Sequence, residues 1–136
     1  MSVGAARRIW LWGPVAVYMA MIFAVSALSE PPAPPGIGDK TGHFLAYAGL
    51  GVVTLRATSG GALSGLRSGA ALAAWAISAI YGASDEVHQR FVPGRTADLL
   101  DLRADAAGAA AGIVVSWLSG ILLRSRRAGG ASPRVL

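Results

Sequence analysis

Four long apolar blocks, separated by polar connections, constrain the fold of this chain more than any other feature of its sequence. The blocks cover residues 9–28, 41–58, 69–89 and 104–123. An α-helix of about 20 apolar residues crosses a hydrocarbon core of roughly 30 Å. Only 14% of the 136 residues are charged, which is low for a soluble domain. The pattern predicts an all-α fold, an integral membrane four-helix bundle with outward-facing polar loops.

The ends of these blocks set the predicted domain boundaries. We expect a single transmembrane domain over residues 1–127, followed by a flexible tail over residues 128–136. The first block has an alternative interpretation as a cleaved signal peptide, because residues 24–26 resemble a cleavage site. Its length and its tryptophans, Trp10 and Trp12, favour a retained span instead.

Glycines inside two of the blocks predict close contacts between helices. Gly49 and Gly51 lie in the second block. Gly108 and Gly112 lie in the fourth block, at the spacing found in closely packed membrane helices. Near the end of the second block, Arg56 is expected to reach toward the lipid headgroups.

The distribution of basic residues predicts which side of the membrane the chain ends face. With four spans, both termini and the middle loop share one side, which carries eight basic residues and no acidic one. The other side carries four basic residues and all seven acidic residues. Since Lys and Arg concentrate on the cytoplasmic side, we expect both termini in the cytoplasm. The net charge of +5 is thus interpreted as a topology signal rather than as a sign of nucleic-acid binding.

Polar clusters adjoin three of the predicted helix ends on the outer side. Their members are Asp39, Lys40 and His43 at the start of the second block, Ser84, Asp85, Glu86 and Gln89 at the end of the third, and Pro93, Gly94, Arg95, Asp98, Asp101 and Asp105 leading into the fourth. Spacings of three and four place several members of each cluster on one helix face. A carboxylate near the membrane core faces the bundle interior, pairs with a partner or lines a wet cavity. We therefore expect the clusters to converge between the helix ends.

The order and spacing of these clusters resemble a known family. The pattern Asp-Lys-x-x-His, then Asp-Glu-x-x-Gln-x-Phe-Val-Pro-Gly-Arg-x-x-Asp-x-x-Asp, then a glycine-containing span, is similar to the VanZ-like family of small bacterial membrane proteins over residues 9–123. Asp105 departs from the family pattern, in which asparagine is common. The family is named for a protein that lowers susceptibility to the antibiotic teicoplanin. The resemblance implies a role in the bacterial cell envelope but supplies no reaction.

The first two clusters each have a functional and a structural interpretation. His43, assisted by Asp39, fits a general base or a metal ligand, or a hydrogen-bonded histidine that joins two helices. Asp85 and Glu86 fit a carboxylate pair with separated pKa values or ligands for a hard cation. They also fit a structural ion pair with a basic residue of the clusters. Adjacent helical positions point about 100° apart, so we expect the two carboxylates to have different partners.

The third cluster has the same two interpretations. Asp98 fits a cap for the fourth helix, with Asp101 three residues on in an approximate capping box. Arg95 fits a binding site for a phosphate or carboxylate, which suits its planar guanidinium, or an ion pair with Glu86 or Asp101. Gly94 is expected to adopt a backbone conformation that other residues avoid.

We assign predicted roles to residues of these clusters and to the two glycines of the fourth block. The predicted catalytic residues are His43, Asp85 and Glu86. The predicted ligand-binding residues are Lys40, Gln89, Arg95, Asp98 and Asp101. The predicted structural residues are Asp39, Pro93, Gly94, Asp105, Gly108 and Gly112. A divalent cation is compatible with these side chains, but no spacing selects or requires one.

Three functions are compatible with this pattern. The first, favoured by the resemblance, is an envelope protein of the bacterial inner membrane that binds or acts on a lipid-linked or peptidoglycan-related ligand at the outer leaflet, with a teicoplanin-resistance type of role. The second is a metal-assisted membrane hydrolase or transferase, although no motif requires catalysis. The third is a membrane scaffold or homo-oligomer with a purely structural polar clasp. The absence of cysteine excludes disulfides and thiolate sites, and no nucleic-acid module is present.

Overall fold

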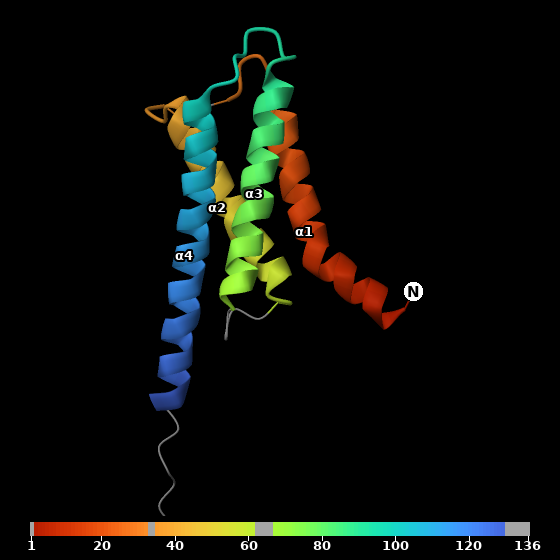
Figure 1. Ribbon diagram of the computed structural model, residues 1–136, viewed down its shortest axis with the longest axis vertical. Coiled ribbons are helices and arrows are strands. Elements are labelled where there is room, and N and C mark those ends of the chain that lie inside the picture. Colours follow the sequence, from red (N-terminus) through yellow and green to blue (C-terminus); the bar gives the residue numbers. More distant parts are fainter. Residues whose placement is uncertain (1, 33–34, 62–66, 130–136) are drawn as a thin grey trace, which may run out of the picture.

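Four helices form one bundle in the computed structural model, which describes residues 2–32, 35–61 and 67–129, with side chains as far as residue 122. In chain order they are α1 (Val3–Ser26), α2 (Asp39–Thr58), α3 (Ser68–Gln89) and α4 (Leu99–Gly129). The central helix is α2, which contacts the other three, whereas α1 packs mainly against α2 (Figure 1). The predicted all-α four-helix bundle is confirmed.

The helix boundaries differ from the predicted spans at both ends of the chain. The first helix starts at Val3, ahead of the predicted residue 9. The last helix starts at Leu99 rather than near residue 104, because Asp98 caps it. It also continues to Gly129, past the predicted start of the tail. Residues 130–136, the rest of that predicted tail, lie outside the described part of the chain.

Two of the helices are long and apolar enough to cross a membrane. They are α1, with a mean hydropathy of 1.8, and the Leu99–Leu122 part of α4, with 1.5. Within the described residues, α2 and α3 do not reach that level. Large apolar side chains nevertheless point outward from all four helices, as Val17, Leu45, Ile80 and Val115 do. Soluble bundles rarely expose so much apolar surface. These outward-facing side chains are compatible with contact to lipid.

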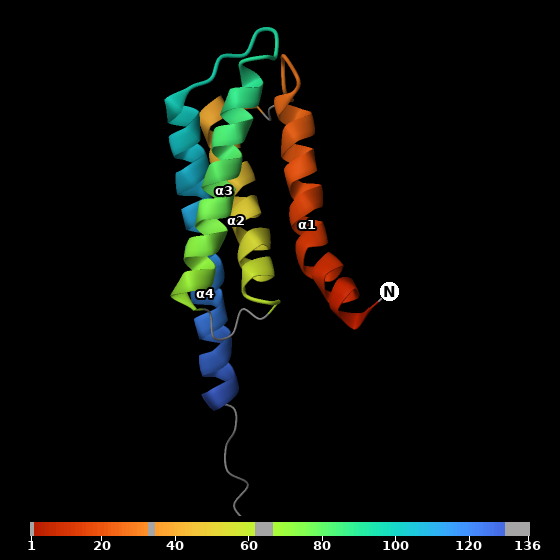
Figure 2. The same ribbon diagram turned by 45° about the vertical axis from the view of Figure 1, so that its right-hand side comes forward.

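A side chain of α2 replaces the hydrogen bond that a proline removes from α1. Pro14 has no N–H, so the Trp10 carbonyl four residues earlier lacks its helical donor. Arg56 Nη1 donates to that carbonyl at 3.2 Å, and the guanidinium lies 3.8 Å from the centre of the Trp10 ring. The N-terminal part of α1 diverges from the bundle (Figure 2). Arg56, expected to reach toward lipid headgroups, thus joins α2 to α1.

Glycines bring α2 and α4 to backbone distance from each other. A side chain at Gly108 would overlap the Phe44 carbonyl, and one at Gly112 would overlap the Ala48 carbonyl. Gly51 of α2 makes the reciprocal contact with the backbone of α4. The predicted close packing is confirmed, and its partner is α2 of the same chain. This face of α4 is therefore already covered, and a second copy cannot use it.

Candidate functional site

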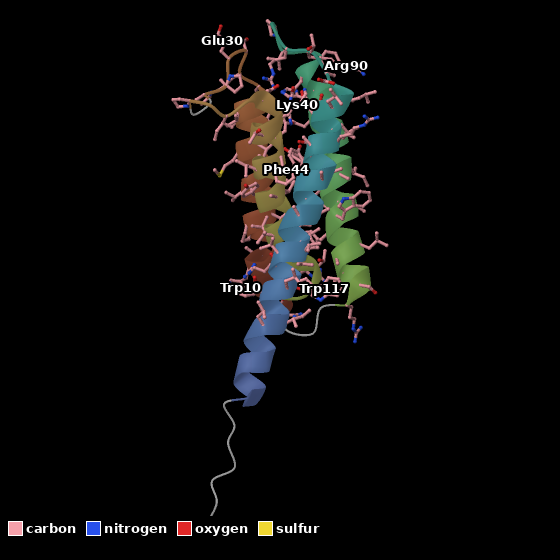
Figure 3. The ribbon with its side chains drawn as sticks, turned by 90° about the vertical axis from the view of Figure 1, so that its left-hand side faces the viewer. Trp10, Glu30, Lys40, Phe44, Arg90 and Trp117 are labelled. Carbon is pink, nitrogen blue, oxygen red and sulfur yellow. The ribbon has the colours of Figure 1, made fainter. Side chains whose placement is uncertain are left out.

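The three polar clusters gather at one end of the bundle. There the N-terminal ends of α2 and α4 meet the C-terminal end of α3. Figure 3 places Glu30, Lys40 and Arg90 at this end and Trp10 and Trp117 toward the opposite one. We call the end that carries Lys40 the polar end. The convergence expected from the helix ends is present.

Lys40 joins the starts of α2 and α4. Its Nζ atom lies 2.8 Å from Asp98 Oδ2 and 3.0 Å from Asp101 Oδ1. The Asp98 side chain is partly exposed, so its ion pair contributes little to stability, whereas Asp101 is buried. The Lys40 ammonium, helped by the Leu100 N–H, holds the pKa of Asp98 below its ordinary value. Lys40 is therefore already paired, which weakens its predicted role as a ligand-binding residue.

Two carboxylates cap the start of α4, one from Asp98 just before the helix and one from Glu86 of α3. Asp98 Oδ1 accepts the Leu100 N–H at 2.8 Å, so the predicted cap is confirmed. The Asp98 N–H is bound by Glu86 Oε2 of α3 at 2.9 Å. The predicted capping box with Asp101 is wrong, because Asp101 pairs with Lys40 instead. Glu86 supplies from α3 the carboxylate that a capping box normally supplies from its own helix.

Asp85 and Glu86 face different helices. Ser26 Oγ, at the end of α1, donates to Asp85 Oδ1 at 2.5 Å. Gln89 Nε2 donates to Asp85 Oδ2 at 3.3 Å. Glu86 instead points to the start of α4, through the Asp98 N–H. The expectation of separate partners is confirmed, but those partners are not basic residues: a hydroxyl and an amide bind Asp85, and a backbone N–H binds one oxygen of Glu86.

Arg95 is positioned by a tight turn. Gly94 has a φ of +81°, and the Arg95 N–H donates to the Val92 carbonyl at 3.1 Å. Pro93 followed by a residue with positive φ is typical of a type II turn, and the conformation expected of Gly94 is confirmed. Arg95 Nη2 donates to Gln89 Oε1 at 2.9 Å.

The charged partner of Arg95 differs from the predicted ones. Its Nη1 atom lies 3.7 Å from Asp39 Oδ1. Glu86 and Asp101, the partners expected from sequence, point instead toward the start of α4 and toward Lys40. The turn before α4 places the guanidinium over the ends of α2 and α3, beyond the reach of both carboxylates.

A further polar contact joins His43 of α2 to Asp105 of α4. His43 Nδ1 lies 2.9 Å from Asp105 Oδ1, and the two side chains are only 9% and 0% exposed. Asp105, and not Asp39, is thus the hydrogen-bonding partner of His43. A sequence signal exists for this pair. Both α2 and α4 begin at the polar end. The steps from Lys40 to His43 and from Asp101 to Asp105 are each about one helical turn, so the pairing of Lys40 with Asp101 is repeated one turn further along by His43 and Asp105.

A pocket of about 330 Å³ opens between α1 and the polar end. Its apolar wall includes Met21, Ile22 and Val25 of α1, together with Ile37, which precedes α2. Its polar wall includes Ser26, Asp39, His43, Asp85, Gln89 and Arg95. The contribution of α1 could not be predicted from the sequence, because an apolar side chain that lines a pocket looks the same in sequence as one that faces lipid.

The chain matches a known protein family over most of its length. A family model described as VanZ/LLP1 matches residues 4–122, which include all four helices and every polar cluster. No curated protein and no solved structure matches the chain.

Proposed function

Since the chain belongs to the VanZ/LLP1 family, we propose that it is a multi-pass protein of the bacterial inner membrane that binds a lipid-linked or peptidoglycan-related ligand at the outer leaflet. Both termini face the cytoplasm in this proposal, because Lys and Arg concentrate on that side. The polar end then lies at the depth of the outer-leaflet headgroups. Abundant envelope ligands there carry phosphates and carboxylates.

The pocket between α1 and the polar end carries this proposal. An acyl or isoprenoid chain suits the apolar wall formed by Met21, Ile22 and Val25. A charged headgroup suits the wall that contains His43 and Arg95. One apolar wall with a few convergent polar groups is the usual composition of a ligand site.

Arg95 is the best-placed headgroup contact among the described residues of the pocket wall. Its guanidinium has five N–H donors, and one of them is bound by Gln89. Its ion pair with Asp39 is long, at 3.7 Å, and Asp39 is 56% exposed. Exchanging such a loose pair for a ligand phosphate costs little, so Arg95 can bind an anion without unfolding its surroundings.

Binding of a polyprenyl monophosphate to the purified chain in detergent, followed by native mass spectrometry, tests this proposal. We expect Arg95→Gln to weaken binding roughly 10- to 100-fold, because charge-assisted hydrogen bonds contribute about 1.5–3 kcal/mol. Arg90→Gln is the matched control, since Arg90 is exposed on the same loop and does not line the pocket.

Equal affinity of the wild type and the Arg95→Gln variant for the polyprenyl monophosphate would contradict the proposed headgroup site. We propose further that this binding underlies a change in teicoplanin susceptibility. The Arg95→Gln variant, expressed at the wild-type level, should then lose any protection that the wild type confers, whereas Arg90→Gln should keep it.

A further inference from the structure

Acidic side chains outnumber their basic partners inside the polar end. Four carboxylates are buried there, Asp85, Glu86, Asp101 and Asp105, with exposures of 3%, 6%, 4% and 0%. Asp101 is neutralised by Lys40. Asp105 is bound by His43, which also acts on Glu86, whereas Asp85 is bound by Ser26 and Gln89 and has no ion-pair partner among the described residues. Buried charges are normally paired or coordinate a metal, so this region lacks positive charge.

Two of these carboxylates also have an oxygen without a partner. Glu86 Oε1 and Asp105 Oδ2 are buried and accept no hydrogen bond from the described residues. The Tyr47 hydroxyl, which is buried between α2 and α3, is unpartnered in the same way. An unsatisfied buried polar atom costs about 1–3 kcal/mol, and more when it is charged. Two such carboxylate oxygens in one place indicate a ligand.

We propose that His43, Glu86 and Asp105 bind a divalent transition-metal cation such as Zn²⁺ or Mn²⁺ between α2, α3 and α4. One nitrogen or oxygen atom from each residue lies within 4.8 Å of the corresponding atoms of the other two. Two carboxylates and one imidazole form a ligand set that suits Zn²⁺ and Mn²⁺ better than Ca²⁺, which prefers oxygen ligands alone. The two carboxylates balance the charge of the ion.

A second group of potential ligands at the polar end is less suitable. Asp39, His43 and Asp101 also offer ligand atoms within 4.8 Å of one another. However, Asp101 is already bound by Lys40, and Asp39 is exposed and lies near Arg95. Both carboxylates therefore have a lysine or arginine partner, whereas Glu86 and Asp105 have neither among the described residues.

The proposed cation site adjoins the pocket, because His43 also lines the pocket wall. A bound ion would thus lie next to the position proposed for a ligand headgroup. The cation proposal does not depend on the lipid proposal, since the unpartnered oxygens belong to Glu86 and Asp105, which lie outside the pocket wall.

Metal binding to the full chain, purified in detergent and stripped with EDTA, tests the proposal. We expect about one Zn²⁺ or Mn²⁺ per chain by elemental analysis after dialysis, and a rise in Tm that EDTA reverses. Glu86→Gln and Asp105→Asn should each weaken metal binding by more than the roughly 10–100-fold that loss of an outer-shell partner costs. Asp98→Asn is the matched control, since Asp98 is partly exposed and paired with Lys40, and it should retain the ion.

The wild-type measurement keeps the test decisive even where a variant fails to fold. No retained ion and no change of Tm with either metal would overturn the proposal. Retention of the ion by both Glu86→Gln and Asp105→Asn would overturn it as well. If those two variants raise the Tm and the wild type ignores both metals, protons rather than a cation neutralise the carboxylates, and the proposal is wrong.

Discussion

The contact between α2 and α4 and the contact of α1 with the bundle differ in what fills them. Between α2 and α4, glycines allow backbone to touch backbone, and the buried pair of His43 and Asp105 crosses the contact. Around α1, long side chains reach across a wider gap. Tyr18 lies against Gly49, and the Tyr81 hydroxyl donates to the Met19 carbonyl at 2.6 Å.

This difference gives the two regions different roles. We call the packed helices α2, α3 and α4 the frame, and we call the contact of α1 with them the entrance. Close backbone packing at Gly108 and Gly112 leaves no space there for a lipid chain or headgroup, so α2, α4 and the adjoining α3 hold the charged groups in fixed positions. The looser α1 contact leaves the pocket of about 330 Å³. Changes between α2 and α4 should therefore affect folding, and changes next to α1 should affect the pocket with a smaller loss of stability.

The largest effect is expected from Gly112→Leu. The new side chain would overlap the Ala48 carbonyl, and a backbone atom cannot move aside as a flexible side chain can. We expect a loss of about 3 kcal/mol or more in unfolding free energy, at the upper end of overpacking effects, measured by unfolding in mixed micelles. Gly69→Leu is the control, because a Cβ at Gly69 meets nothing within 4 Å. If both variants unfold alike, the backbone contact is not what holds the frame.

An intermediate effect is expected from Ser26→Ala, which acts on the α1 side. It removes the hydroxyl that donates to buried Asp85 at 2.5 Å, and such a loss costs about 1–3 kcal/mol. Ser84→Ala is the control, since Ser84 is exposed and donates only to a carbonyl of its own helix. A loss as large as that of Gly112→Leu would contradict the distinction between frame and entrance.

The smallest effect concerns pH and the exposed edge of the frame. Lys40 lowers the pKa of Asp98 below its ordinary value of 3.8. The pair therefore contributes stability above that value and loses it as the pH falls through the lower folded-state pKa. Melting curves between about pH 2 and 6 should show a small acid-side loss that Asp98→Asn removes, while Asn still caps α4. An identical acid-side loss in both proteins would assign it to another carboxylate.

Much of this fold could be predicted from the sequence, because its strongest signals are local. The length of the apolar blocks predicted four helices, and the spacing of the glycines predicted a close contact between helices. The polar clusters gave the polar end, and Asp98 was identified as a cap. Each of these depends on residues a few positions apart, within one helix or at its end.

The partners across helices could not be predicted in the same way. The pairing of His43 with Asp105, the contact of Glu86 with the Asp98 N–H and the bond from Arg56 to Trp10 depend on how each helix is rotated and how far it is shifted along its neighbour. In a membrane bundle the packed and lipid-facing sides are both apolar, so hydrophobic periodicity does not fix that rotation. Only the matching steps of Lys40 to His43 and Asp101 to Asp105 indicated a register.

The parallel arrangement of α2 and α4 has an electrostatic consequence for the polar end. Each helix places the positive end of its macrodipole there, equivalent to about half an elementary charge, and Asp39 and Asp101 lie in those first turns. Asp85 and Glu86 instead lie near the C-terminal end of α3, where the helix dipole is negative. These two carboxylates gain nothing from their own backbone, so the end of α3 is where an added positive charge has the most to stabilise.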